Sequence, residues 1–155
     1  MVTPGTTGEH LVKAQAFLKA VKALLDAGLA ERAVSEAYYA AFHTAQALLA
    51  TAGLAAETHG GVQTLLARHF VKDGPLPPGA ARAFSHLMAD RLLADYGVDR
   101  QIDEAGGADA VAAALALIRD LLGAVESRAP GAGSVVAALR RQLGDIAPDD
   151  ADPRA

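Results

Sequence analysis

Arg91 and Asp95 are opposite charges whose residue types and spacing suit a polar site on an otherwise apolar helix face. Arg91 and Asp95 are four residues apart, so their side chains pair on one face of a helix, and both fall within an apolar stripe that includes Phe84. Charges removed from water are costly unless they are paired. This face is therefore expected to meet a polar pocket or a partner surface, or else to hold an ion pair at the rim of the core. Arginine stays charged and grips two phosphate oxygens at once, which makes Arg91 the candidate cation.

Tyr39 and His43 form a second candidate site in the segment 31–50. They are four residues apart and lie opposite an apolar stripe, so they share the polar face of an amphipathic helix. Histidine is the side chain best suited to proton transfer near neutral pH, and the pair is a candidate for binding a ligand. The alternative is that both are ordinary, partly buried residues with satisfied polar atoms, and the sequence leaves both interpretations open.

His59, Gly60 and Gly61 follow Thr58, which is a plausible helix cap. The first amides of a helix have no partner within it, and small side chains leave them accessible to an anion. These three residues are therefore an anion-binding candidate. A flexible turn is the alternative.

The elements that must position these residues are helices, because apolar residues recur every three or four positions along most of the chain. Thr6 and Glu9 have the spacing of a capping box, and Gly28 suits the end of the first helix. The pattern predicts an all-α fold without strands. The expected helices span residues 8–27, about 31–53, 58–71, 80–96 and 108–128, with a shorter one at 134–143.

Composition excludes several classes of protein. The 155 residues contain no cysteine, which rules out disulfides and thiolate chemistry, and no metal or other cofactor is expected. A net charge of −4 argues against broad electrostatic binding of nucleic acid but not against a local basic site. The longest apolar run, Ala110–Ile118, is too short to span a bilayer. We also see no signal peptide and expect a cytoplasmic protein without membrane contact.

Four motifs resemble those of the HEPN family of small helical domains, and they occur in the family's order. They are Ala37-Tyr38-Tyr39-Ala40-Ala41-Phe42-His43, Thr58-His59-Gly60-Gly61-Val62, Arg68-His69-Phe70 and the stretch from Arg91 to Asp95-Tyr96. The resemblance covers about residues 8–124. It implies an antiparallel, up-and-down four-helix bundle with a short additional helix, usually assembled as a homodimer. The expected organisation of the chain is a tail (1–7), the bundle (8–128) and a short helix with a disordered acidic tail (129–155).

The resemblance also implies a function in which RNA, a nucleotide or a nucleotidyltransferase antitoxin is the partner. Many HEPN domains are metal-independent ribonucleases and act as toxins, with an arginine followed by a histidine as the catalytic motif. Arg91 matches the arginine, but Tyr96 occupies the histidine position. A tyrosine with a pKa of about 10 is a poor general base at neutral pH.

Three functions remain open at this point. The first is a binding module that uses Tyr39, His43, Arg91 and Asp95 to bind RNA, a nucleotide or the nucleotidyltransferase partner of a toxin–antitoxin system. The second is a ribonuclease in which Arg91 holds the scissile phosphate and His43 replaces the missing base. The third is a structural dimerisation unit. We expect the first, with slow or absent ribonuclease activity.

Overall fold

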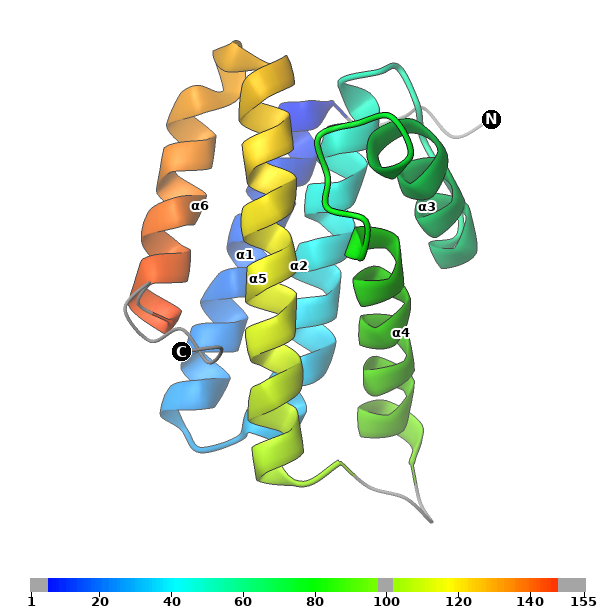
Figure 1. The fold of residues 1–155 in the computed structure, drawn as a ribbon. Coiled ribbons are helices and arrows are strands. Elements are labelled where there is room, and N and C mark those ends of the chain that lie inside the picture. Colours follow the sequence, from blue (N-terminus) through cyan, green and yellow to red (C-terminus); the bar gives the residue numbers. More distant parts are fainter. Residues whose placement is uncertain (1–5, 98–101, 148–155) are drawn as a thin grey trace.

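The fold is organised around one central helix, α2, which contacts four other helices (Figure 1). The computed structural model describes residues 6–97 and 102–147, and this part of the chain is helical without strands, as predicted. In Figure 1, α6 lies at one edge of the bundle, and α3 and α4 lie at the other. The helices are α1 (Thr7–Asp26), α2 (Ala30–Ala50), α3 (His59–Leu66), η1 (Ala67–Val71), α4 (Ala80–Tyr96), α5 (Glu104–Arg128), η2 (Pro130–Ala132) and α6 (Gly133–Ile146).

The many alanines of α2 explain why this helix is buried on most of its circumference. Their small side chains let α1 and α5 pack closely against α2, while leucine and valine side chains fill the remaining space. Tyr38 is the largest side chain that α2 buries completely. The buried alanines of this helix are Ala30, Ala33, Ala37, Ala40, Ala41, Ala45 and Ala47.

Local signals in the sequence set the ends of the first three helices. The Thr6 hydroxyl accepts a hydrogen bond from the Glu9 amide at 3.0 Å, and Thr58 caps α3 in the same way. Gly28 adopts a φ of 76°, which turns the chain from α1 into α2 at no steric cost. These features agree with the predicted caps at Thr6 and Thr58 and the predicted turn at Gly28, whereas α2 ends at Ala50 rather than near Gly53.

The start of α5 differs from the expectation. The segment before Ala108 is expected to be a connector, yet α5 begins at Glu104 because the Asp103 carboxylate accepts from the Gly106 amide at 2.7 Å and caps an earlier turn. Gly107 lies inside α5 at a point where this helix passes close to α2, so that no side chain fits between them. A Cβ atom at Gly107 would lie 2.8 Å from Glu31 Cα.

The short helix expected after the bundle packs into the same core. The side chains of Val136, Leu139 and Leu143 are buried, and α6 contacts α1 and α5. The flanking tails expected from the sequence fall largely on residues 1–5 and 148–155, which lie outside the described residues. Among the helices described, none has the length and hydropathy that a membrane span requires.

Candidate functional site

Arg91 lies on the side of α4 that faces α2, where its guanidinium contacts two tyrosine rings. The Cζ atom is 4.9 Å from the ring centroid of Tyr39 and 5.5 Å from that of Tyr38. A cation over an aromatic face is stabilised electrostatically, and more strongly when water is excluded. Only 13% of the Arg91 side chain is exposed. The rings therefore hold a permanent positive charge near the surface in a defined orientation.

Asp95 is the acidic partner of Arg91. Its Oδ2 atom lies 3.3 Å from Arg91 Nε, and it also accepts a hydrogen bond from the Ser35 hydroxyl at 3.4 Å. The Nε–H bond is poorly aligned with the carboxylate, so Nε is buried without a hydrogen-bond partner. Arg91 and Asp95 thus form an ion pair between residues one turn apart in α4, without a hydrogen bond at Nε. Arg91 Nη1 also donates a hydrogen bond to Met88 Sδ at 3.7 Å, and this sulfur is a weak acceptor that an oxyanion can replace.

Tyr38 and His59 form a hydrogen bond beside the guanidinium. The Tyr38 hydroxyl meets His59 Nδ1, and the two ring centroids are 5.2 Å apart. Burial raises the pKa of Tyr38, although the nearby charge of Arg91 opposes this, so the phenol stays protonated. Burial and then the charge of Arg91 lower the pKa of His59. A neutral imidazole therefore lies next to a permanent cation at neutral pH.

The start of α3 positions His59. The Gly61 amide is already bonded to the Thr58 hydroxyl at 2.9 Å. A Cβ atom at Gly61 would lie 3.0 Å from Thr58 Oγ1, so this turn needs a small residue. At the predicted anion site, the His59 side chain is thus brought to Arg91, while Gly60 and Gly61 shape the turn. We refer to Tyr38, Tyr39, His59, Arg91 and Asp95 as the Arg91 cluster.

His43 lies on the opposite flank of Tyr39, between α2 and α1. Its ring stacks on Phe17 with a centroid distance of 5.6 Å, and its Nδ1 lies 3.1 Å from Nδ1 of His10. Burial, together with the smaller effects of the neighbouring His10 and Lys13, lowers the pKa of His43 to about 4. The ring of Phe17 also stacks on Tyr39 at 5.4 Å. In this chain of ring contacts, Phe17 and Tyr39 stand between His43 and the guanidinium.

Tyr96 is the last residue of α4, and 69% of it is exposed. Five residues along a helix turn a side chain by roughly 140°. The position of the expected histidine therefore faces away from the side of α4 that carries Arg91. Leu92, one turn before Tyr96, is also exposed at 44%.

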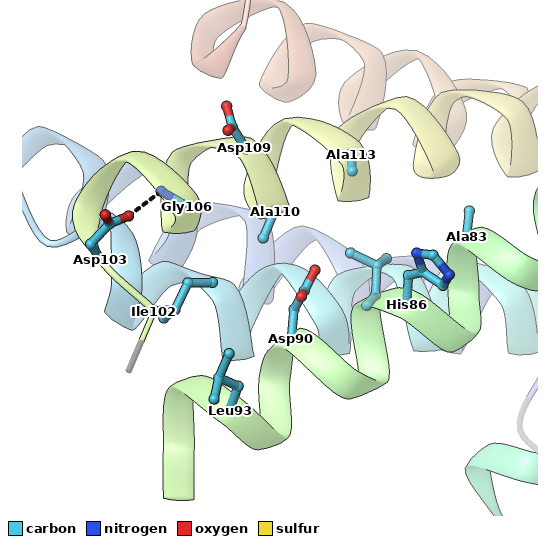
Figure 2. A pocket seen from close by; sticks show the side chains of 11 residues that line it. Ala83, His86, Asp90, Leu93, Ile102, Asp103, Gly106, Asp109, Ala110 and Ala113 are labelled. Atoms are coloured by element: carbon cyan, nitrogen blue, oxygen red, sulfur yellow. Dashed lines mark hydrogen bonds between the residues drawn. The ribbon is translucent and has the colours of Figure 1, made fainter. Parts of the chain in front are cut away.

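A separate cavity lies between α4 and α5 (Figure 2). Its volume is about 610 Å³. Asp90 points into it, although its neighbour in sequence, Arg91, faces α2. None of the candidate residues predicted from the sequence lines this cavity, so it is not part of the predicted site. Its lining consists of Ala83, His86, Leu87, Asp90, Leu93, Ile102, Asp103, Gly106, Asp109, Ala110 and Ala113.

Tyr38 and Phe17 fall on the apolar stripes of their helices, a pattern typical of core residues, and neither they nor His10 is among the candidate residues predicted from the sequence. A buried tyrosine hydroxyl needs a hydrogen-bond partner, and that requirement could have linked Tyr38 to a polar group on another helix. Phe17 and His10 carried no such signal. Their role depends on how α1 lies across α2, which helical periodicity does not determine.

The fold and the Arg91 cluster define a small, all-helical domain with a largely buried arginine between two helices. The sequence profile of the HEPN domain matches residues 7–127, and the chain belongs to the HEPN family. It is 36% identical over 91 residues to a protein of Methanocaldococcus jannaschii named "Putative toxin", covering 59% of this chain and 68% of that protein.

Two further relatives carry the name UPF0332 protein. The one from Pyrococcus horikoshii is 29% identical over 102 residues, which cover 72% of it and 66% of this chain. The one from Gloeobacter violaceus is 34% identical over 85 residues, which cover 68% of it and 55% of this chain. All three matches agree with membership of the HEPN family.

Proposed function

We propose that this HEPN protein binds RNA or a nucleotide, with Arg91 contacting a phosphate group. The observation that carries the proposal is the placement of the guanidinium over the rings of Tyr38 and Tyr39. Rings on one side and Asp95 at Nε fix its orientation, so little side-chain entropy is lost when an oxyanion binds. Because the chain carries a net charge of −4, affinity depends on this local site rather than on a broad basic surface.

The test is the affinity for a labelled single-stranded RNA, measured by fluorescence anisotropy in the presence of a chelator. Arg91→Gln should weaken binding at least about tenfold, since charge-assisted bidentate contacts are among the stronger hydrogen bonds. Arg82→Gln is the matched control, because Arg82 is an exposed arginine on the same helix. Equal affinities for the two variants would contradict the proposal.

The second candidate function is metal-independent cleavage of RNA. One observation favours it, namely the neutral His59 imidazole beside the guanidinium. In such a reaction a base removes the 2′-hydroxyl proton, the 2′-oxygen bonds to phosphorus, and the 5′-oxygen leaves and takes a proton. We expect slow or absent cleavage because Tyr38 occupies Nδ1 of His59 and Tyr96 replaces the motif histidine. If cleavage occurs in chelator, loss of activity in His59→Ala but not in His43→Ala would assign the base to His59.

We further propose that the protein acts as the toxin of a toxin–antitoxin pair, with a nucleotidyltransferase as its antitoxin. The name of the Methanocaldococcus jannaschii relative supports a toxin-like role. Expression of the chain alone should then slow growth, and co-expression of its cognate nucleotidyltransferase should relieve this effect. Unimpaired growth under strong expression would contradict the toxin role.

A symmetric homodimer built on α4 is the assembly that we propose. Leu92 and Tyr96 expose apolar surface one turn apart on this helix, and an isologous contact would cover both at once. Light scattering at micromolar concentration should give a dimer, and Leu92→Asp should convert it to a folded monomer. A monomeric wild type with full helicity would contradict this assembly and, with it, the alternative role of a structural dimerisation unit.

A further inference from the structure

Four aromatic rings form a continuous series of contacts that begins under Arg91 and ends at the first turns of α1. Tyr39 stacks on Phe17 at 5.4 Å with an interplanar angle of 25°. Phe17 stacks on His43 at 5.6 Å and 10°, and His43 stacks on His10 at 5.4 Å and 28°. All four residues are partly exposed. We call this set, His10, Phe17, Tyr39 and His43, the ring staircase.

The rings cover one another only in part. Atoms in contact are about 3.5 Å apart, so centroid distances of 5.4–5.6 Å imply that each ring is displaced sideways by roughly 4 Å from the next. Part of each ring face therefore stays outside the stack. A planar, apolar ligand group gains stacking energy on such a surface without separating the rings.

The chain has few aromatic residues, and most of them gather here. It contains four phenylalanines, three tyrosines and no tryptophan. Ring contacts connect five of these seven residues around the staircase and the Arg91 cluster. Elsewhere alanine and leucine build the core. The five connected residues are Phe17, Tyr38, Tyr39, Phe42 and Phe84.

Positive charge lies at both ends of the staircase. Arg91 stands over Tyr39 at one end. At the other end, the charge of Lys13 lowers the pKa of His10 and His43 in addition to the effect of burial, while the charge of Glu9 opposes this at His10. Stacking rings combined with cations are the features by which proteins hold single-stranded nucleic acids without reading their sequence.

We propose that the ring staircase binds the bases of single-stranded RNA while Arg91 contacts its backbone. This inference rests on the proposed function, since it extends the phosphate contact at Arg91 into a base-binding surface. A mononucleotide offers one base, whereas a single strand can place successive bases on Tyr39, Phe17 and the histidine pair. The preferred ligand is then unpaired RNA, because pairing hides the base faces within the duplex.

The experiment uses the full chain and a single-stranded RNA of about eight nucleotides that contains 2-aminopurine. Stacking quenches 2-aminopurine fluorescence, so the wild type should quench it on binding. Phe17→Leu should abolish the quench and raise Kd about tenfold, whereas Phe17→Tyr, which keeps the ring, should behave as the wild type. Phe70→Leu is the matched control, because it removes a buried ring far from the staircase in the sequence.

An abasic strand of the same length provides an independent test. It uses the wild type alone, so it remains valid even if Phe17→Leu fails to fold. The abasic strand should bind about tenfold more weakly than the strand with bases. Arg91-dependent binding that is unchanged by loss of the bases, without any quench, would overturn the staircase and leave the proposed function intact. Absence of binding to any RNA would overturn both.

Discussion

The guanidinium of Arg91 lies 4.9 Å from the ring centroid of Tyr39, and this contact joins α4 to α2 at the centre of the candidate site. The contact explains how an arginine can lie within an apolar stripe. The ring faces replace part of the water that the cation loses, and Asp95 balances the charge at Nε. It also makes Tyr39 a shared element, since the same ring stacks on Phe17.

The first prediction concerns Asp95, which competes with a phosphate for Arg91. Asp95→Asn should raise the affinity for RNA by about two- to fivefold, since one negative charge next to the cation is removed. Stability should fall by less than about 1 kcal/mol because the ion pair is partly exposed. Anisotropy titrations check the affinity. Weaker binding by Asp95→Asn would instead show that the orienting effect of Asp95 on Arg91 outweighs this competition, or that Asp95 contacts the ligand.

The second prediction concerns the hydroxyl of Tyr38. Tyr38→Phe leaves His59 Nδ1 without its partner and should lower the free energy of unfolding by about 1–2 kcal/mol. For a chain of this length the melting temperature should fall by roughly 2–8 °C. Tyr39→Phe is the matched control at the neighbouring, partly exposed tyrosine. Identical melting temperatures for wild type and Tyr38→Phe would argue against the hydrogen bond.

The Tyr38–His59 pair marks the limit of what the sequence could predict. Apart from the start of α5 and the end of α2, periodicity and caps located the helices, because apolar spacing and the residues Thr6, Gly28 and Thr58 act locally. Periodicity also placed Tyr38 in the core, where it is fully buried. The partner of its hydroxyl depends on the angle at which α3 crosses α2, and no local pattern encodes that angle.

The α5 start shows the same limit in the fold. Two glycines at 106 and 107 are typical of a loop, yet both lie inside α5. The close approach of Gly107 to Glu31 requires the absence of a side chain, and that requirement comes from tertiary packing. For the candidate site, Arg91, Asp95, Tyr39 and His59 were found from their types and spacing, and their functional roles remain predictions.

The third prediction tests this packing. Gly107→Ala would place a Cβ atom 2.8 Å from the Glu31 backbone, and separating the helices should cost roughly 1–3 kcal/mol. Gly123→Ala in the same helix meets no atom within 4 Å and should stabilise the protein by about 0.5–1 kcal/mol, because alanine favours helix. Denaturant unfolding measures both. Equal effects at the two positions would contradict the close approach of α5 to α2.

The fourth prediction is a dependence of stability on pH that arises from His43. Its pKa is about 4 in the folded protein and about 6.5 in an unfolded chain. Between these values the unfolded state binds more protons, so stability is complete above about pH 6.5 and falls as the pH drops towards 4. Burial lowers the pKa of His10 as well, in the same direction.

Thermal melts of His43→Gln should reveal this contribution. Lowering the pH from 7 to 5 should reduce the stability of the wild type by roughly 1 kcal/mol more than that of the variant, after allowance for solvent screening of a partly exposed group. If the stability of the wild type and that of His43→Gln fell equally with pH, His43 would titrate in the folded protein as it does in the unfolded chain. That result would also argue against its close contact with His10.

The most direct measurement of the central claim, that Arg91 contacts a phosphate, is the salt dependence of RNA binding. Each phosphate contact with a single strand contributes about 0.7 to the slope of log Kd against log salt concentration. Arg91→Gln should reduce the slope by about this amount, and Arg82→Gln should leave it unchanged. Equal slopes for the wild type and Arg91→Gln would contradict a phosphate contact at Arg91.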